Sequence, residues 1–88
     1  MRNLKILQEE LEKYNSKDIS IRFEGSLRAF IIIENARCMA TYKTLLIGNM
    51  EKDNQEFQLD LDEVINIEIS KETILYVNGN YRIYIYNR

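Results

Sequence analysis

The sequence predicts an α+β protein in which one N-terminal helix packs on an antiparallel sheet or small barrel of about five to seven short strands. Three observations support this prediction. An apolar stripe with helical spacing occurs near the start, strict two-residue alternation follows it, and an Asn-Gly pair near the end joins two apolar runs. With 88 residues, the chain has room for one modest core. We therefore expect a single domain over residues 1–88, with a helix at about 3–14 and β-structure over 19–87.

The helix is predicted from apolar residues that recur every three or four positions, namely Leu4, Leu7, Leu11 and Tyr14. The residues between them are polar and favour helices. Small polar residues follow at positions 15, 16 and 18, so we expect the helix to end near position 14.

The strands are predicted from alternation. Ile19, Ile21 and Phe23 alternate with polar residues, which indicates a half-buried strand. The next run, at 27–34, contains Phe30-Ile31-Ile32-Ile33 and is apolar on both faces. We expect it to be a central strand that the helix covers on one side. Residues 37–48 should add one or two further strands.

The alternation is interrupted in the second half of the chain. Phe57, Leu59 and Leu61 alternate with polar residues, and the isoleucines at 65, 67 and 69 continue the alternation with Val64 out of step. A bulge or bend near Asp62-Glu63 would produce this interruption.

The last hairpin is predicted from Asn78-Gly79, the preferred pair for a two-residue type I′ turn. Such a turn would place Val77 opposite Asn80 and Leu75 opposite Arg82. In this interpretation the core receives Ile74, Tyr76, Tyr81, Ile83 and Ile85. The other face carries Leu75, Val77, Arg82, Tyr84 and Tyr86. That face is either covered by a second sheet or the helix, or it is a patch for self-association or stacking, because tyrosine and arginine dominate interface energies.

The composition argues against catalysis and against a bound metal or cofactor. There is no histidine, the lone Cys38 has no partner for a disulfide or zinc site, and the three glycines are too scattered for a phosphate-binding loop. Asp60 and Asp62 could share a face and chelate a hard cation, but the rest of a calcium loop is missing. We expect no enzyme, no cofactor and no metal, and we expect Cys38 to be a small buried hydrophobe.

Charge is distributed unevenly along the chain. The net charge is −2, whereas residues 51–72 carry eight acidic and two basic groups. A solvated polar face explains this pattern. The functional alternative is an acidic surface that meets a basic protein partner, with the candidate residues Glu51, Asp53, Glu56, Asp60, Asp62, Glu63 and Glu68.

These observations favour a non-enzymatic protein-binding module. Anti-CRISPR and anti-restriction inhibitors of phages and mobile elements are similar to this chain only in being short, acidic and poor in motifs. The alternatives are a small structural or assembly subunit that forms a homodimer through its C-terminal hairpin, and an Sm-like or OB-like single-stranded nucleic-acid binder. The pI of about 5.1 argues against nucleic acid. The longest apolar run, at 29–33, is too short to cross a membrane, and we expect a cytosolic location.

Overall fold

The computed structural model describes residues 4–52, 54–78 and 80–88, which form one helix and eight strands. The elements follow one another along the chain as α1 (Leu4–Glu12), β1 (Ile19–Gly25), β2 (Ala29–Ile33), β3 (Ala36–Ala40), β4 (Thr44–Asn49), β5 (Glu56–Asp60), the 3₁₀ turn η1 (Leu61–Glu63), β6 (Val64–Ile69), β7 (Thr73–Val77) and β8 (Tyr81–Asn87). The predicted α+β class is confirmed. The described residues contain more strands than the five to seven expected.

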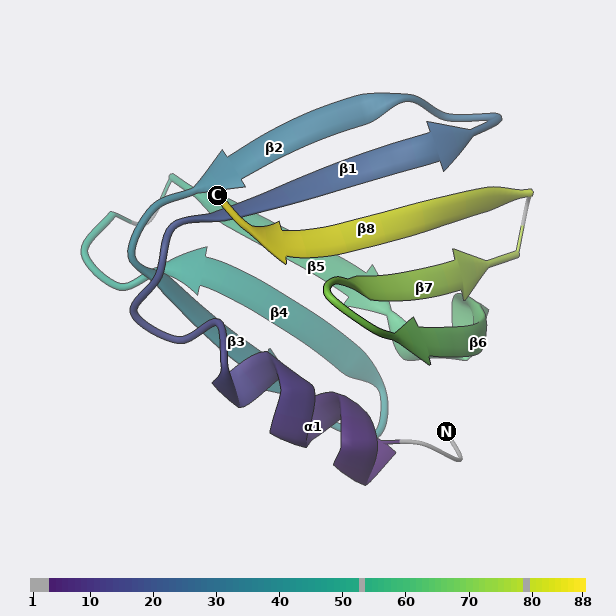
Figure 1. Cartoon of the computed structure of the whole chain (residues 1–88), viewed down its shortest axis with the longest axis horizontal. Helices are drawn as coiled ribbons and strands as arrows, with labels where there is room; N and C mark the ends of the chain where they lie inside the picture. The colour runs from purple at the N-terminus through teal and green to yellow at the C-terminus, as the bar shows by residue number, and fades with distance from the viewer. Residues whose placement is uncertain (1–3, 53, 79) are drawn as a thin grey trace.

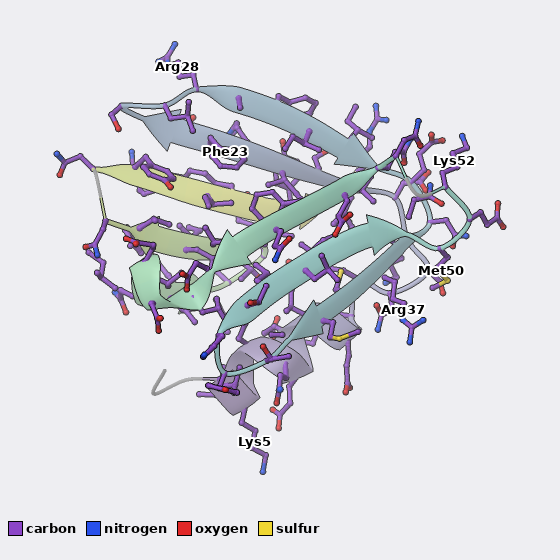
Figure 2. The ribbon with its side chains drawn as sticks, turned by 180° about the vertical axis from the view of Figure 1, so that it is seen from behind. Lys5, Phe23, Arg28, Arg37, Met50 and Lys52 are labelled. Carbon is purple, nitrogen blue, oxygen red and sulfur yellow. The ribbon has the colours of Figure 1, made fainter. Side chains whose placement is uncertain are left out.

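The strands form two antiparallel sheets that face each other. The five-stranded sheet has the order β2-β1-β8-β7-β6, and the three-stranded sheet has the order β3-β4-β5. Figure 1 shows the five-stranded sheet toward the viewer, with the first and last strands, β1 and β8, side by side within it. Figure 2 shows the opposite side, where the three-stranded sheet lies in front and α1 lies beside β3.

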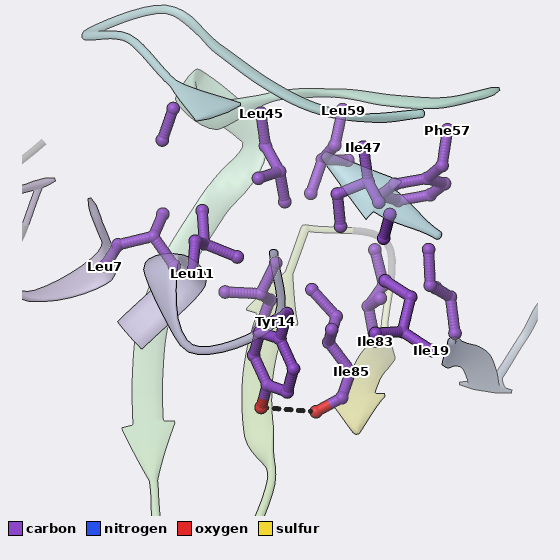
Figure 3. Packing of buried hydrophobic residues seen from close by; sticks show 14 of the residues in the cluster. Leu7, Leu11, Tyr14, Ile19, Leu45, Ile47, Phe57, Leu59, Ile83 and Ile85 are labelled. Atoms are coloured by element: carbon purple, nitrogen blue, oxygen red, sulfur yellow. Dashed lines mark hydrogen bonds between the residues drawn. The ribbon is translucent and has the colours of Figure 1, made fainter. Parts of the chain in front are cut away.

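The core lies between the two sheets, and the helix closes one side of it. Figure 3 shows side chains of the three-stranded sheet pointing toward those of the five-stranded sheet, with Leu7 and Leu11 of α1 beside them. The predicted apolar stripe is the buried face of the helix, since Leu7, Leu11 and Tyr14 are all buried. Residues from the two sheets that fill the core include Ile19, Leu45, Ile47, Phe57, Leu59, Ile83 and Ile85.

The predicted bend near Asp62-Glu63 is confirmed, and it takes the chain from one sheet to the other. The turn η1 links β5 of the three-stranded sheet to β6 of the five-stranded sheet. Asp60 begins this turn, because its carboxylate accepts a hydrogen bond of 2.9 Å from the N–H of Asp62. A register irregularity between Val64 and Asn66 follows. β5 and β6 are therefore not paired neighbours.

The prediction that the strand at 27–34 is a central one is wrong. β2 is an edge strand, and the helix packs against β3 instead. Ile33 and Ile31 pair with the buried Ile19 and Ile21 and face the core, whereas Phe30 faces outward and is 56% exposed. The outward-facing side chains of this edge strand are apolar as well, and this explains why the run is apolar on both faces.

The predicted register of the last hairpin is also wrong by one residue. Val77 pairs with Tyr81 and Leu75 pairs with Ile83, so three residues form the turn, and the last of them, Asn80, has a φ of +67°. Of the two predicted turn residues, Asn78 and Gly79, the second lies outside the described residues. A three-residue loop lets Leu75 and Ile83 point to the core together, whereas the two-residue turn would turn Leu75 outward.

Candidate functional site

The outer face of the five-stranded sheet is a candidate contact surface. No described helix lies over it, since α1 lies beside β3 (Figure 1). Its side chains alternate along each strand with those of the core. We call it the tyrosine face, and it consists of Arg22, Glu24, Phe30, Ile32, Asn66, Glu68, Ile74, Tyr76, Arg82, Tyr84 and Tyr86, all of which are partly or fully exposed.

Strand pairing arranges these side chains in three rows across the sheet. A short row contains Ile32 and Tyr86, with Ser20 between them. In the first of the two longer rows the residues that pair successively from β2 to β6 are Phe30, Arg22, Tyr84, Ile74 and Glu68. In the second longer row, one pair nearer the β7–β8 turn, the order from β1 to β6 is Glu24, Arg82, Tyr76 and Asn66. Each of the two longer rows therefore combines aromatic or apolar groups with one positive and one negative charge.

Two guanidinium groups lie against the central tyrosine of the face. The guanidinium carbon of Arg22 is 4.6 Å from the ring centroid of Tyr84 and 5.8 Å from that of Tyr86. That of Arg82 is 5.9 Å from the Tyr84 centroid. Such cation–π contacts each stabilise exposed sites by about 0.5–1 kcal/mol. They also cover ring surface that a stacking ligand would need.

Arg22 keeps hydrogen-bonding capacity in spite of its ion pair. Its Nε lies 3.4 Å from a carboxylate oxygen of Glu24, yet this buried nitrogen has no hydrogen-bond acceptor among the described residues. The contact with Glu24 is thus an electrostatic one without hydrogen-bond geometry. The Arg22 side chain as a whole is about 40% exposed and can receive a further acceptor.

A carboxylate lies at the far edge of the same face. The hydroxyl of Tyr76 donates a hydrogen bond of 2.6 Å to Oε2 of Glu68. This bond raises the pKa of Tyr76, with desolvation and the charge of Glu68 acting in the same direction. Neither of the two ion pairs found among the described residues involves Glu68. The tyrosine face therefore carries a positive group on β1 and, on β6, a negative group without a cationic partner in the described part of the chain.

The residues predicted for self-association or stacking are divided by the structure. Arg82, Tyr84 and Tyr86 lie on the tyrosine face, but Leu75 and Val77 are core residues. Sequence reasoning missed Arg22, Phe30 and Ile32. The sequence did contain a signal, because each of them lies between two inward-facing residues of β1 or β2. The prediction that the second strand is covered on both faces obscured this signal.

The predicted acidic residues do not form one continuous patch. Glu56 and Asp60 lie at opposite ends of β5, about 13 Å apart at the usual rise per residue. Asp62 and Glu63 belong to η1, and Glu51 lies in the loop after β4. Glu68 is on the other sheet, and Asp53 lies outside the described residues. What remains is a small group at the end of β5, formed by Asp60, Asp62 and Glu63, which we call the acidic corner.

Comparison with known proteins adds no family to this geometry. No protein-family model matches the chain, and neither a curated protein nor a solved structure matches it at a significant level. In the part of the chain that the structure describes, no group of three acidic, histidine or cysteine side chains is arranged to hold a metal ion. No helix in that part has the length and apolar character needed to cross a membrane.

Proposed function

We propose that this protein is a non-enzymatic protein-binding module and that the tyrosine face is its contact surface. The observation that carries the proposal is the character of this face. An antiparallel sheet with one face in water normally has polar side chains there. Here the uncovered face carries one phenylalanine, three tyrosines and two isoleucines around two arginines. Aromatic residues and arginine are the types enriched in protein interfaces.

A protein partner fits this face better than single-stranded nucleic acid does. Bases stack on free aromatic rings and need a basic surface for their phosphates. The ring of Tyr84 is already in contact with both arginines, and Glu24 and Glu68 offset their positive charge. The whole chain is acidic, with a net charge of −2. These features support protein recognition.

Within this class our functional proposal is a mobile-element inhibitor of the anti-CRISPR or anti-restriction kind. The acidic corner supports a partner that also has a basic region, because Asp60, Asp62 and Glu63 are exposed at one end of β5. Replacing Asp62 and Glu63 with lysine should then slow association at low salt and have little effect at high salt, where exposed charges are screened. Asp60 is left intact in this variant because its carboxylate caps η1.

Photo-cross-linking in cells tests the proposal even while the identity of the partner is unknown. A photoreactive amino acid is placed at Ile74 on the tyrosine face or, as the matched control, at Gln58 on the outer face of β5. We expect protein adducts from position 74 and few from position 58. Adducts with nucleic acid, or equal labelling at both positions, would overturn the tyrosine face as a protein-contact surface.

A further inference from the structure

We propose that the partner of the tyrosine face is a second copy of this chain, packed face to face about a twofold axis that runs along the strands between β7 and β8. This inference rests on the proposed function of the face as a protein-contact surface and names its occupant. It follows from the order of charged and apolar groups in the two longer rows described above.

The first row is complementary to itself when it is reversed. Rotation about the proposed axis places β8 over the partner's β7, and β1 over the partner's β6. Arg22 then faces the partner's Glu68, and Tyr84 faces the partner's Ile74. Because a twofold interface repeats every contact, the dimer contains two such ion pairs around four large side chains.

The second row is complementary under the same rotation. Arg82 faces the partner's Tyr76, which allows a cation–π contact across the interface. Glu24 faces the partner's Asn66, whose amide can donate to a carboxylate. No like charges face each other in this arrangement. The face as a whole carries Arg22 and Arg82 against Glu24 and Glu68, so two copies meet without net repulsion.

Other positions of the axis fit the unsatisfied groups less well. An axis along β8 would set Arg82 against the partner's Arg82 and Arg22 against an isoleucine, which is unfavourable for both arginines. An axis between β1 and β8 would pair Glu24 with the partner's Arg82 but would leave Glu68 outside the interface. Of these three axes, only the proposed one brings the exposed part of the Arg22 guanidinium and the carboxylate of Glu68 together.

The size of the stacked area is adequate if all four stacked strands are used, with β2 at the edge outside it. Four strands spaced by about 4.8 Å, each of five to seven residues rising about 3.3 Å, give a footprint of roughly 400 Å² in projection. The accessible area exceeds the projection because large side chains stand out from the sheet. A stable interface buries roughly 800 Å² on each partner, so the second copy has to cover β1, β8, β7 and β6 completely.

A charge-swap experiment tests the arrangement by light scattering or sedimentation of the full chain. Arg22→Glu and Glu68→Arg should each weaken the dimer roughly 100-fold, because each places like charges together twice. An equimolar mixture of the two single variants should form a mixed dimer, since both of its contacts join opposite charges. The double variant should also dimerise. In the double variant the two substituted residues cannot form an ion pair with each other within one chain, because positions 22 and 68 lie three strand spacings apart, about 14 Å.

The matched control is Glu56→Arg on the three-stranded sheet, which should leave the dimer unchanged. A wild-type protein that remains monomeric at high micromolar concentration would overturn the proposal, and so would single variants whose mixture stays monomeric. Cross-links from position 74 to a different protein, with a monomeric wild type, would remove the second copy and leave the proposed function standing. Absence of protein cross-links from that position would remove both.

Discussion

The hydroxyl of Tyr14 donates a hydrogen bond of 3.0 Å to the main-chain carbonyl of Ile85, and it lies 3.0 Å from Oγ1 of Thr73. These contacts join the segment after α1 to β8 and β7, and they lie in the core (Figure 3). Tyr14 thus satisfies buried polar groups on two strands that are distant from it in the sequence. It is the main polar link between the helical segment and the five-stranded sheet among the described residues.

Removing this hydroxyl should destabilise the protein. We expect Tyr14→Phe to lower the free energy of unfolding by about 1–2 kcal/mol, because Thr73 and the Ile85 carbonyl lose a buried partner. Tyr86→Phe on the tyrosine face is the control and should change it by less than about 0.5 kcal/mol. Urea unfolding of the two variants measures the difference. Equal losses would contradict the structural role of Tyr14.

The register of the β7–β8 hairpin can be tested with two neighbouring residues. Leu75→Ala should cost about 2–5 kcal/mol because Leu75 is completely buried. Ile74→Ala should cost clearly less, since Ile74 lies on the tyrosine face. Measurements at low protein concentration keep any self-association out of the comparison. The reverse order of losses would favour a two-residue turn.

Two glycines should respond in different ways to alanine. Gly25 has a φ of +129°, and a Cβ there would lie 2.3 Å from the carbonyl oxygen of Asn80. Gly25→Ala should therefore cost at least about 1–3 kcal/mol through backbone strain, with the clash in addition. At Gly48 the nearest atom to an added Cβ is 3.6 Å away, an ordinary contact. Gly48→Ala should be neutral or stabilise by up to about 1 kcal/mol. Thermal unfolding of both variants tests this contrast.

Stability should fall at alkaline pH in a way that depends on Cys38, which is partly buried against the core. Desolvation raises the pKa of the Cys38 thiol from 9.0 to about 12. The folded state therefore holds a proton that the unfolded state releases, so this stabilisation is complete below about pH 9 and is lost as pH rises toward 12. Burial also raises the pKa of Tyr14 above its ordinary value of 10.0, which acts in the same direction.

The contribution of the thiol is isolated by Cys38→Ala. Its free energy of unfolding should decline less steeply between about pH 9 and 10.5 than that of the wild type, measured by urea unfolding at each pH. Identical slopes for the two proteins would show that the thiol does not titrate differently in the folded and unfolded states.

Several elements followed from the sequence because their signals are local. The stripe of Leu7, Leu11 and Tyr14 identified both the helix and its buried face. The interruption of the alternation near Asp62 identified the bend that η1 makes. Helical spacing and strand alternation depend on residues a few positions apart, so one sequence is enough to detect them.

The candidate site depended on tertiary structure. Tyr84 and Tyr86 were predicted to be contact residues, but only the pairing of β1 with β8 brings Arg22 beside them. Conversely, the turn η1 and the sheet change separate Glu68 from the acidic residues that precede it. Alternation shows which residues of a strand share a face, whereas the choice of the buried face and of the neighbouring strand is decided by contacts between segments far apart in the chain.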